Sequence, residues 1–144
     1  MTEEALDRLI AWFETLSPQS VARTGEFYAP DAHFRDPFND VRGVERIERI
    51  YAHMFEQVSE PRFAVIAWHH KNDSAMLLWE LSFRARPGAA VAIVRGTTHL
   101  RFDAQGRVSA HHDYWDPAGA LYEGVPLLGA LLRAVRRRLS APQD

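Results

Sequence analysis

The chain has 144 residues, of which 47% are hydrophobic and 25% charged, and a formal net charge of -2, as expected for one globular domain with a single core. These values argue against a disordered, collagen-like or coiled-coil chain, and they predict no nucleic-acid binding, since the only basic cluster is four arginines over 133–138. The absence of cysteine excludes disulfides and thiolate chemistry, and the acidic start and lack of a membrane-length apolar run predict a cytoplasmic protein.

Two helices are predicted at the start of the chain. Apolar residues recur at helical spacing over 6–16, and Thr2 stands where a capping residue is expected. Pro18, in the first position of a helix, then predicts a second helix that continues through Tyr28 and ends before Pro30.

A short strand, a third helix and four longer strands are predicted next. The strand covers 32–36, and an apolar stripe over 44–58 predicts a helix that Pro61 ends. Runs of strand-like residues, separated by short polar turns, then occupy 62–70, 75–86, 90–102 and 107–115. Short turns imply an antiparallel meander, so the order of elements predicts an α+β fold with three N-terminal helices packed on one face of a curved sheet.

The whole chain, 1–144, is predicted to be one domain, with a core over about 5–116 and a C-terminal helical extension over 117–140. Pro126 starts the predicted helix of this extension, with arginines opposite its apolar face. The apolar face consists of Leu127, Leu128, Leu131, Leu132, Val135 and Leu139. We expect this face to cover apolar surface of the same chain or of a second subunit, the alternative being an anionic membrane surface.

The last predicted strand carries the main candidate site. Alternation along the strand places His111, Asp113 and Trp115 on one face. A titratable pair beside an aromatic side chain favours a functional cleft. The alternative is a polar pair whose members only satisfy each other's hydrogen bonds inside the fold.

A second candidate is Asp36, which closes the short strand just before Pro37. Its carboxylate could act as a general base at the mouth of a cavity, beside Phe38, or could accept backbone hydrogen bonds in a turn. Trp79, Leu81 and Phe83 share one face of another strand, and together with Trp115 they would line an apolar cavity or simply fill the core.

Neither a metal nor a cofactor is expected. The pair His111 and Asp113 has the spacing of part of a facial iron site, but no histidine follows residue 112 to complete it. Glycine motifs that bind phosphate and the nucleophile elbow of hydrolases are absent from the sequence.

Four features occur together in this chain. They are the early helices, the segment Tyr28-Ala29-Pro30-Asp31-Ala32-His33-Phe34-Arg35-Asp36-Pro37, a helix opened by Arg42-Gly43, and strands bearing Gly96-Thr97-Thr98-His99. In this combination the chain resembles the nuclear transport factor 2-like superfamily, and its SnoaL-like branch in particular. The resemblance covers about residues 5–116. It implies a cone-shaped fold, in which a bent antiparallel sheet wraps around the helices and leaves an apolar cavity. Members include ketosteroid isomerase, polyketide cyclases and non-catalytic binders, so the fold alone does not decide the function.

Residue by residue, the resemblance assigns roles to a few positions. Asp36 stands where ketosteroid isomerase has its proton-shuttling aspartate, whereas Trp12 and Thr98 replace the two oxyanion donors of that enzyme. His111 and Asp113 also depart from the isomerase and are similar to the polar groups that SnoaL-like cyclases use on this strand.

Two classes of function follow. In the first, a cofactor-free isomerase, cyclase or dehydratase acts on a small apolar molecule, with Asp36 as base and His111, oriented by Asp113, as acid or second base. In the second, the same cavity binds such a molecule without chemistry. Trp12, Phe38, Trp79, Leu81, Phe83, Thr98 and Trp115 are the expected ligand-binding residues. We also expect a homodimer through the outer face of the sheet, where Leu78, Glu80 and Ser82 lie, and no membrane association.

Overall fold

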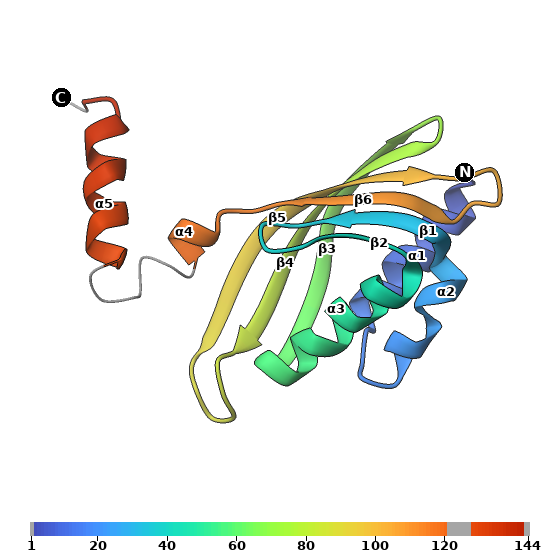
Figure 1. The fold of residues 1–144 in the computed structure, drawn as a ribbon, viewed down its shortest axis with the longest axis horizontal. Coiled ribbons are helices and arrows are strands. Elements are labelled where there is room, and N and C mark those ends of the chain that lie inside the picture. The colour runs from blue at the N-terminus through green and yellow to red at the C-terminus, as the bar shows by residue number, and fades with distance from the viewer. Residues whose placement is uncertain (1, 121–127, 143–144) are drawn as a thin grey trace. The chain divides into compact units, whose positions relative to one another are not determined.

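The computed structural model describes residues 2–120 and 128–142, and the chain divides into two compact units, Met1–Tyr114 and Trp115–Asp144. The first unit has the predicted α+β fold, in which helices lie against the concave side of a curved sheet (Figure 1). Its helices are α1 (Glu3–Glu14), the 3-10 helix η1 (Ser20–Arg23), α2 (Thr24–Phe27) and α3 (Val44–Gln57).

The first helix forms as the sequence predicts. Thr2 caps α1, because its hydroxyl accepts a hydrogen bond from the backbone N–H of Ala5 at 3.2 Å. Leu6 and Leu9 on its inner face are completely or almost completely buried. Burial of this apolar stripe stabilises a helix that would be marginal in isolation.

The second helix is shorter than predicted. Instead of one helix reaching Tyr28, the structure has η1 and the single turn of α2, and strand β1 (Tyr28–Arg35) already begins at Tyr28. A residue that precedes proline favours an extended backbone, which brings the chain out of the helix before Pro30. Pro30 itself falls where the pairing of β1 with its neighbour shifts register, a place where a missing N–H is tolerated.

Six strands form one open sheet in the order β2-β1-β6-β5-β4-β3. Besides β1, they are β2 (Asp40–Arg42), β3 (Ser59–Lys71), β4 (Ser74–Arg84), β5 (Val91–Phe102) and β6 (Val108–Tyr114). The last four pair antiparallel in sequence, which confirms the predicted meander. Strand β1 pairs parallel with β6, and the very short β2 was not predicted.

The sequence predicted that Pro61 ends the third helix, but Pro61 lies inside β3. Helix α3 stops at Gln57, and β3 is an edge strand whose pairing shifts register between Ser59 and Arg62. An edge strand with an irregular start can hold a proline because one of its sides needs no N–H.

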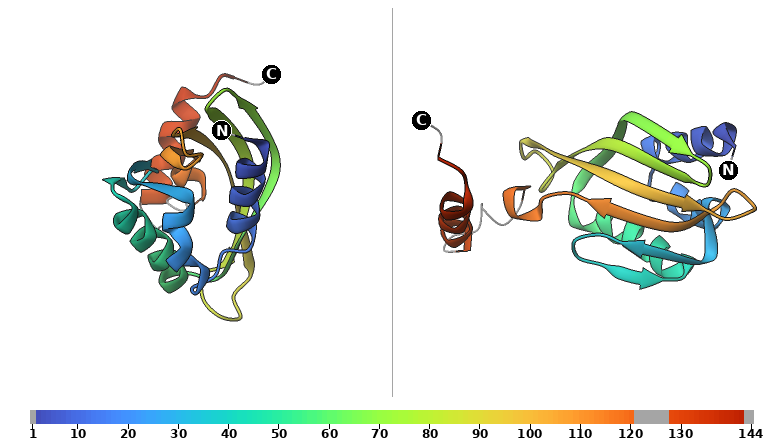
Figure 2. Two further views of the ribbon diagram at one scale, coloured as in Figure 1. Left: turned by 90° about the vertical axis from the view of Figure 1, so that its right-hand side faces the viewer. Right: turned by 90° about the horizontal axis from the view of Figure 1, so that it is seen from above.

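The curved sheet and the helices enclose one apolar core (Figure 2). Alternation along the strands sends one set of side chains to this core and the other to the outer face. On β4, for example, Leu77 and Trp79 are buried whereas Met76 is 43% exposed. Thr98 of β5 and His111 of β6 also point to this core, where they form part of the candidate site.

The second unit contains α4 (Pro117–Ala120) and α5 (Leu128–Leu139). Helix α5 has the predicted apolar face, with Leu131, Val135 and Leu139 all exposed. Pro126 and Leu127, which the sequence placed at its start, lie outside the described residues. Within the described ranges, no helix has the length and apolar character needed to cross a membrane.

Candidate functional site

A small pocket opens at the inner face of the sheet, with a volume of about 30 Å³. That space holds about two water molecules. Aromatic and aliphatic side chains make up most of its wall, and the polar groups come mainly from β5 and β6. The lining residues are Phe13, Tyr51, Phe63, Val65, Leu77, Trp79, Thr98, His111 and Asp113.

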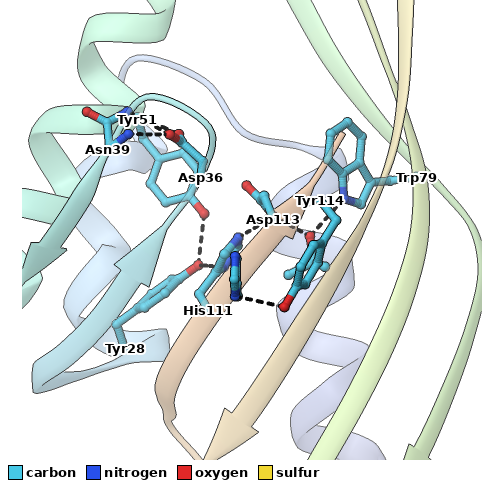
Figure 3. A network of polar contacts seen from close by, with 10 residues as sticks. Tyr28, Asp36, Asn39, Tyr51, Trp79, His111, Asp113 and Tyr114 are labelled. Atoms are coloured by element: carbon cyan, nitrogen blue, oxygen red, sulfur yellow. Dashed lines mark hydrogen bonds and ion pairs between the residues drawn. The ribbon is translucent and has the colours of Figure 1, made fainter. Parts of the chain in front are cut away.

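A chain of hydrogen bonds runs along one side of this pocket (Figure 3). The Tyr51 hydroxyl lies 2.8 Å from the Tyr28 hydroxyl, which lies 2.8 Å from Nδ1 of His111. The other ring nitrogen of His111, Nε2, lies 2.7 Å from Oδ1 of Asp113. The helix α3, the strand β1 and the strand β6 thus each contribute a member of one connected network.

The network continues from Asp113 onto β5 and β4. The hydroxyl of Thr98 donates to Oδ1 of Asp113 at 2.5 Å, and the indole N–H of Trp79 donates to Thr98 at 2.7 Å. An indole N–H can only donate, and an ionised carboxylate can only accept. These two ends therefore fix the direction of the hydrogen bonds between them.

The same reasoning fixes the tautomer of a neutral His111. Because the carboxylate of Asp113 accepts, Nε2 of the ring carries the hydrogen and Nδ1 is the acceptor. The Tyr28 hydroxyl then donates to Nδ1 and accepts from Tyr51. Every hydrogen in this part of the network has a partner, as buried polar groups require.

His111 is held inside an aromatic cage and is only 4% exposed. Its ring stacks on Phe34 at 4.6 Å between centroids and meets Phe13 edge-on at 6.1 Å. Since Tyr28 and Asp113 occupy both ring nitrogens, the imidazole has no nitrogen left to contact a ligand directly. Proton exchange between His111 and a ligand must pass through one of these two neighbours.

Asp113 has the open acceptor of the site. Its Oδ1 accepts the hydrogen bonds from His111 and Thr98, whereas its Oδ2 has no hydrogen bond from any residue that the structure describes. This oxygen is not fully buried either, and the side chain is 17% exposed. Asp113 is also one of the residues that line the pocket.

The two tyrosines stay protonated at ordinary pH. Burial raises the pKa of Tyr28 well above its usual range, against the opposing effect of its hydrogen bond with Tyr51. Burial also raises the pKa of Tyr51, and the neighbouring hydroxyl of Tyr28 and the charge of Asp113 add to the increase. Both residues therefore act as neutral hydroxyls, able to donate and accept at once.

The structure places Asp36 in a turn, where its carboxylate accepts hydrogen bonds from the turn itself. Oδ1 accepts from the backbone N–H groups of Phe38 at 2.7 Å and Asn39 at 2.6 Å, and the Asn39 side-chain amide donates to both carboxylate oxygens. Figure 3 shows this carboxylate turned toward Asn39. Asp36 is not among the residues that line the pocket. This geometry is that of a turn residue.

The expected ligand-binding residues are distributed unevenly. Trp79 and Thr98 line the pocket, whereas Leu81 and Phe83 lie farther along β4, half-buried and outside the lining. Trp12 is buried in α1, stacks on Phe27 and donates its indole N–H to the carbonyl of Ser20. Phe38 is 51% exposed in the turn after β1. Trp115 belongs to the second unit.

Sequence reasoning overlooked the two tyrosines. The apolar stripe over 44–58 includes Tyr51, and Tyr28 stands at the end of the predicted second helix. The available signal was the hydroxyl itself, because a tyrosine on the buried face of a helix needs a hydrogen-bond partner. The partner could not be named until β1 was known to begin at Tyr28.

No cluster of metal ligands occurs in the part of the chain that the structure describes. No group of three or more histidine, cysteine, aspartate or glutamate side chains there is arranged to hold an ion. His111 and Asp113 are hydrogen-bonded to each other and to neutral hydroxyls.

Comparison with known proteins agrees with this architecture. The sequence profile of the SnoaL-like domain matches residues 9–111. No protein of curated function matches the sequence.

Solved structures with the same fold share little sequence with the chain. A protein of ketosteroid isomerase-like fold from Catenulispora acidiphila, in complex with trimethylamine, is 16% identical with a TM-score of 0.70, covering 84% of this chain and 92% of its own. An NTF2-like protein of unknown function from Burkholderia pseudomallei is 14% identical with a TM-score of 0.69, covering 97% and 100%. A protein assigned as a SnoaL-like polyketide cyclase from Shewanella putrefaciens is 17% identical with a TM-score of 0.65, covering 81% and 92%.

Proposed function

Because the chain belongs to the SnoaL-like domain family, whose profile spans residues 9–111, we propose that its inner pocket binds a small apolar molecule and moves a proton on it without a cofactor. The fold suggests small-molecule binding and isomerase- or cyclase-type chemistry. Which reaction takes place, and on which molecule, depends on the groups in the pocket.

The observation that carries the proposal is the open Oδ2 of Asp113 beside a histidine that is already bonded to Oδ1. In the proposed reaction, Oδ2 accepts a proton from an acidic C–H or O–H of the ligand. The hydrogen bonds from His111 and Thr98 to Oδ1 hold the carboxylate in one orientation for the transfer. The base is therefore Asp113, and His111 acts through it.

This proposal gives Asp36 a different role from the one that the family resemblance implies. A base must have a lone pair directed at the ligand, whereas Asp36 accepts hydrogen bonds from residues 38 and 39 and is not among the residues that line the pocket. We propose that Asp36 holds the turn after β1 and so fixes the end of the strand next to β6.

The apolar wall of the pocket supports an apolar ligand. Phe13, Phe63, Val65 and Leu77 surround the polar groups and would exclude water once a ligand is bound. A resting volume of about 30 Å³ is too small for a ring, so a ring-sized ligand enters only when side chains of this wall move.

The first experiment asks whether a small molecule is bound. Full-length protein is purified gently and analysed by native mass spectrometry, and any released molecule is identified. The variant Val65→Phe fills the pocket from its wall and should abolish the bound mass. A matched control, Ile93→Phe, adds the same ring to an exposed position of β5 and should retain it.

The second experiment separates chemistry from binding. The identified molecule is incubated with protein in D₂O, and exchange of its acidic hydrogen is followed by NMR. Asp113→Asn should slow the exchange about a hundredfold, the scale for losing a general base, while the molecule still binds. Binding without any protein-catalysed exchange would favour the non-catalytic binding protein instead.

We also propose that two copies of the chain pair through the outer face of the sheet. Met76, Ile93 and Tyr114 are exposed apolar side chains on that face. Sedimentation analysis at high micromolar concentration should show a dimer, and Ile93→Glu should weaken it. A monomer at that concentration would overturn the pairing.

A further inference from the structure

Hydrogen atoms that could be donated into the pocket are scarce. The indole hydrogen of Trp79 goes to Thr98, and the hydroxyl hydrogen of Thr98 goes to Asp113. The hydrogen on Nε2 of His111 also goes to Asp113. Of the polar side chains that line the pocket, this leaves only the hydroxyl of Tyr51 as a potential donor.

With a neutral His111, that hydroxyl is not available as a donor either. Nδ1 accepts from Tyr28, so the oxygen of Tyr28 accepts the hydrogen of Tyr51. The lone pairs of the Tyr51 oxygen are then not used by Tyr28, and Tyr51 lines the pocket. In this state the pocket offers acceptors only, namely Tyr51 and Oδ2 of Asp113.

With a cationic His111, the direction of both tyrosine hydrogen bonds reverses. Nδ1 now carries a hydrogen and donates to the oxygen of Tyr28. The hydrogen of Tyr28 must turn to the oxygen of Tyr51, its other neighbour at 2.8 Å. The hydrogen of Tyr51 is thereby released for a group in the pocket.

We propose that Tyr51 is a second ligand-contacting group, and that Tyr28 couples it to His111 so that Tyr51 donates a hydrogen bond into the pocket only when His111 is protonated. The ligand class that this favours carries an acceptor oxygen, such as a ketone, next to its apolar body. This inference rests on the proposed function of the pocket, which supplies the ligand.

In this arrangement the pocket has a donor and a base at the same time. A ketone oxygen accepts from Tyr51 while the Oδ2 of Asp113 takes a proton from the adjacent carbon. If Tyr51 passes its proton to the ketone oxygen, Tyr51 receives the proton of Tyr28, and Tyr28 receives the proton of Nδ1 of His111. The ligand then loses one proton and gains another, and the imidazolium and carboxylate become imidazole and carboxylic acid.

Few other ionisable groups face His111. Asp113 of the same strand, Tyr28 of β1 and Tyr51 of α3 contact or adjoin its ring, and Phe13 of α1 and Phe34 of β1 cover the rest. Asp36, in the turn beyond β1, raises the pKa of Tyr51 through its charge, and His112, on the outer face of the same strand, interacts through charge with His111 and Asp113.

The first test follows the imidazole nitrogen resonances of His111 against pH in labelled full-length protein without ligand. Tyr51→Phe removes the only acceptor for the Tyr28 hydrogen in the cationic state, so the midpoint of the His111 titration should fall by about one pH unit. Tyr28→Phe removes the acceptor for Nδ1 itself and should lower the midpoint further. Tyr114→Phe removes a hydroxyl bound to His112 on the outer face and should leave His111 unchanged.

The second test uses cyclohexanone, which accepts hydrogen bonds but does not donate them, and toluene, which neither accepts nor donates them. Binding is measured by chemical-shift changes at pH values above and below the His111 midpoint. Cyclohexanone should bind about tenfold more tightly below the midpoint, the scale of one hydrogen bond, and toluene should bind equally at both. In Tyr51→Phe the pH dependence for cyclohexanone should disappear.

The outcomes separate this inference from the function on which it rests. An unchanged His111 midpoint in both Tyr51→Phe and Tyr28→Phe, or a cyclohexanone affinity independent of pH in the parent protein, would overturn the coupling. Failure of both probes to bind would instead overturn the opening of the pocket to ring-sized molecules, and the ligand-free titration would still decide whether Tyr28 and Tyr51 respond to the charge of His111.

Discussion

The two faces of β6 carry the same pair of residue types in different surroundings. On the inner face, Nδ1 of His111 lies 2.8 Å from the hydroxyl of Tyr28. On the outer face, Nδ1 of the next residue, His112, lies 2.9 Å from the hydroxyl of Tyr114. Each histidine thus has a tyrosine partner at nearly the same distance, Tyr28 on the neighbouring strand β1 and Tyr114 on β6 itself.

Burial and one carboxylate make the difference between the faces. His111 is enclosed by aromatic rings and bonded to Asp113, whereas His112 stacks on an exposed tyrosine at 4.0 Å between centroids. A hydrogen bond in water exchanges freely with solvent, but one between buried groups fixes the position of each proton. The comparison teaches that the histidine–tyrosine pair becomes a candidate site only where solvent cannot replace either partner.

The largest expected contrast between the faces is in folding stability. His111→Ala removes a stacked ring and leaves Tyr28 and Asp113 without their shared partner, so the free energy of unfolding should fall by about 3 kcal/mol. His112→Ala should change it by less than about 1 kcal/mol, because this half-buried side chain on the outer face loses fewer contacts. Urea unfolding of both variants checks the contrast, and equal losses would contradict it.

A second contrast is expected at alkaline pH. Burial raises the pKa of both Tyr28 and Tyr51, whereas tyrosines in the unfolded chain ionise near pH 10. Their contribution is therefore fully present below about pH 10 and is lost as pH rises toward the folded-state pKa, by about 1.4 kcal/mol per pH unit for each buried tyrosine.

The measurement is the unfolding free energy between pH 9 and 11. Tyr28→Phe should reduce the slope of the unfolding free energy against pH by about 1.4 kcal/mol per pH unit, the contribution of one buried tyrosine. Tyr114 is 51% exposed, so Tyr114→Phe should leave the slope as it is in the parent protein. The prediction fails if the two variants have the same slope.

The smallest expected effect on stability concerns Asp36, in the turn after β1, the strand that pairs with β6. Asp36→Ala removes the acceptor of the turn after β1 and should cost about 1 kcal/mol of stability, as for other side chains that cap backbone amides. Asp36→Asn keeps an acceptor oxygen and should cost less. Neither change should alter proton exchange in the pocket, so a hundredfold loss of exchange in Asp36→Asn would restore Asp36 as the base.

The sequence predicted the fold well because its signals are local. Alternation along 75–86 and 90–102, with polar turns between, predicted the meander, and Thr2 predicted the start of α1. Prediction was poorer where proline was the guide. Pro30 and Pro61 suggested breaks between elements, but both lie within strands at register shifts that only the assembled sheet reveals.

The candidate site was only partly predictable. Alternation along β6 placed His111 and Asp113 on one face, and both line the pocket. The use of the Asp36 carboxylate depends on how the turn closes over residues 38 and 39, and the contribution of Tyr51 depends on how α3 packs on β1. Such contacts between distant segments leave no spacing pattern in the chain.

The small resting volume of the pocket, about 30 Å³, has a kinetic consequence. If a ring-sized ligand binds only to an open arrangement of the wall, its apparent affinity is reduced by the fraction of time that arrangement is populated. Its association rate should then level off at high ligand concentration, at the rate at which Phe63, Val65 and their neighbours move aside. A substitution that widens the wall, such as Val65→Ala, would speed association even where it removes contacts with the bound ligand.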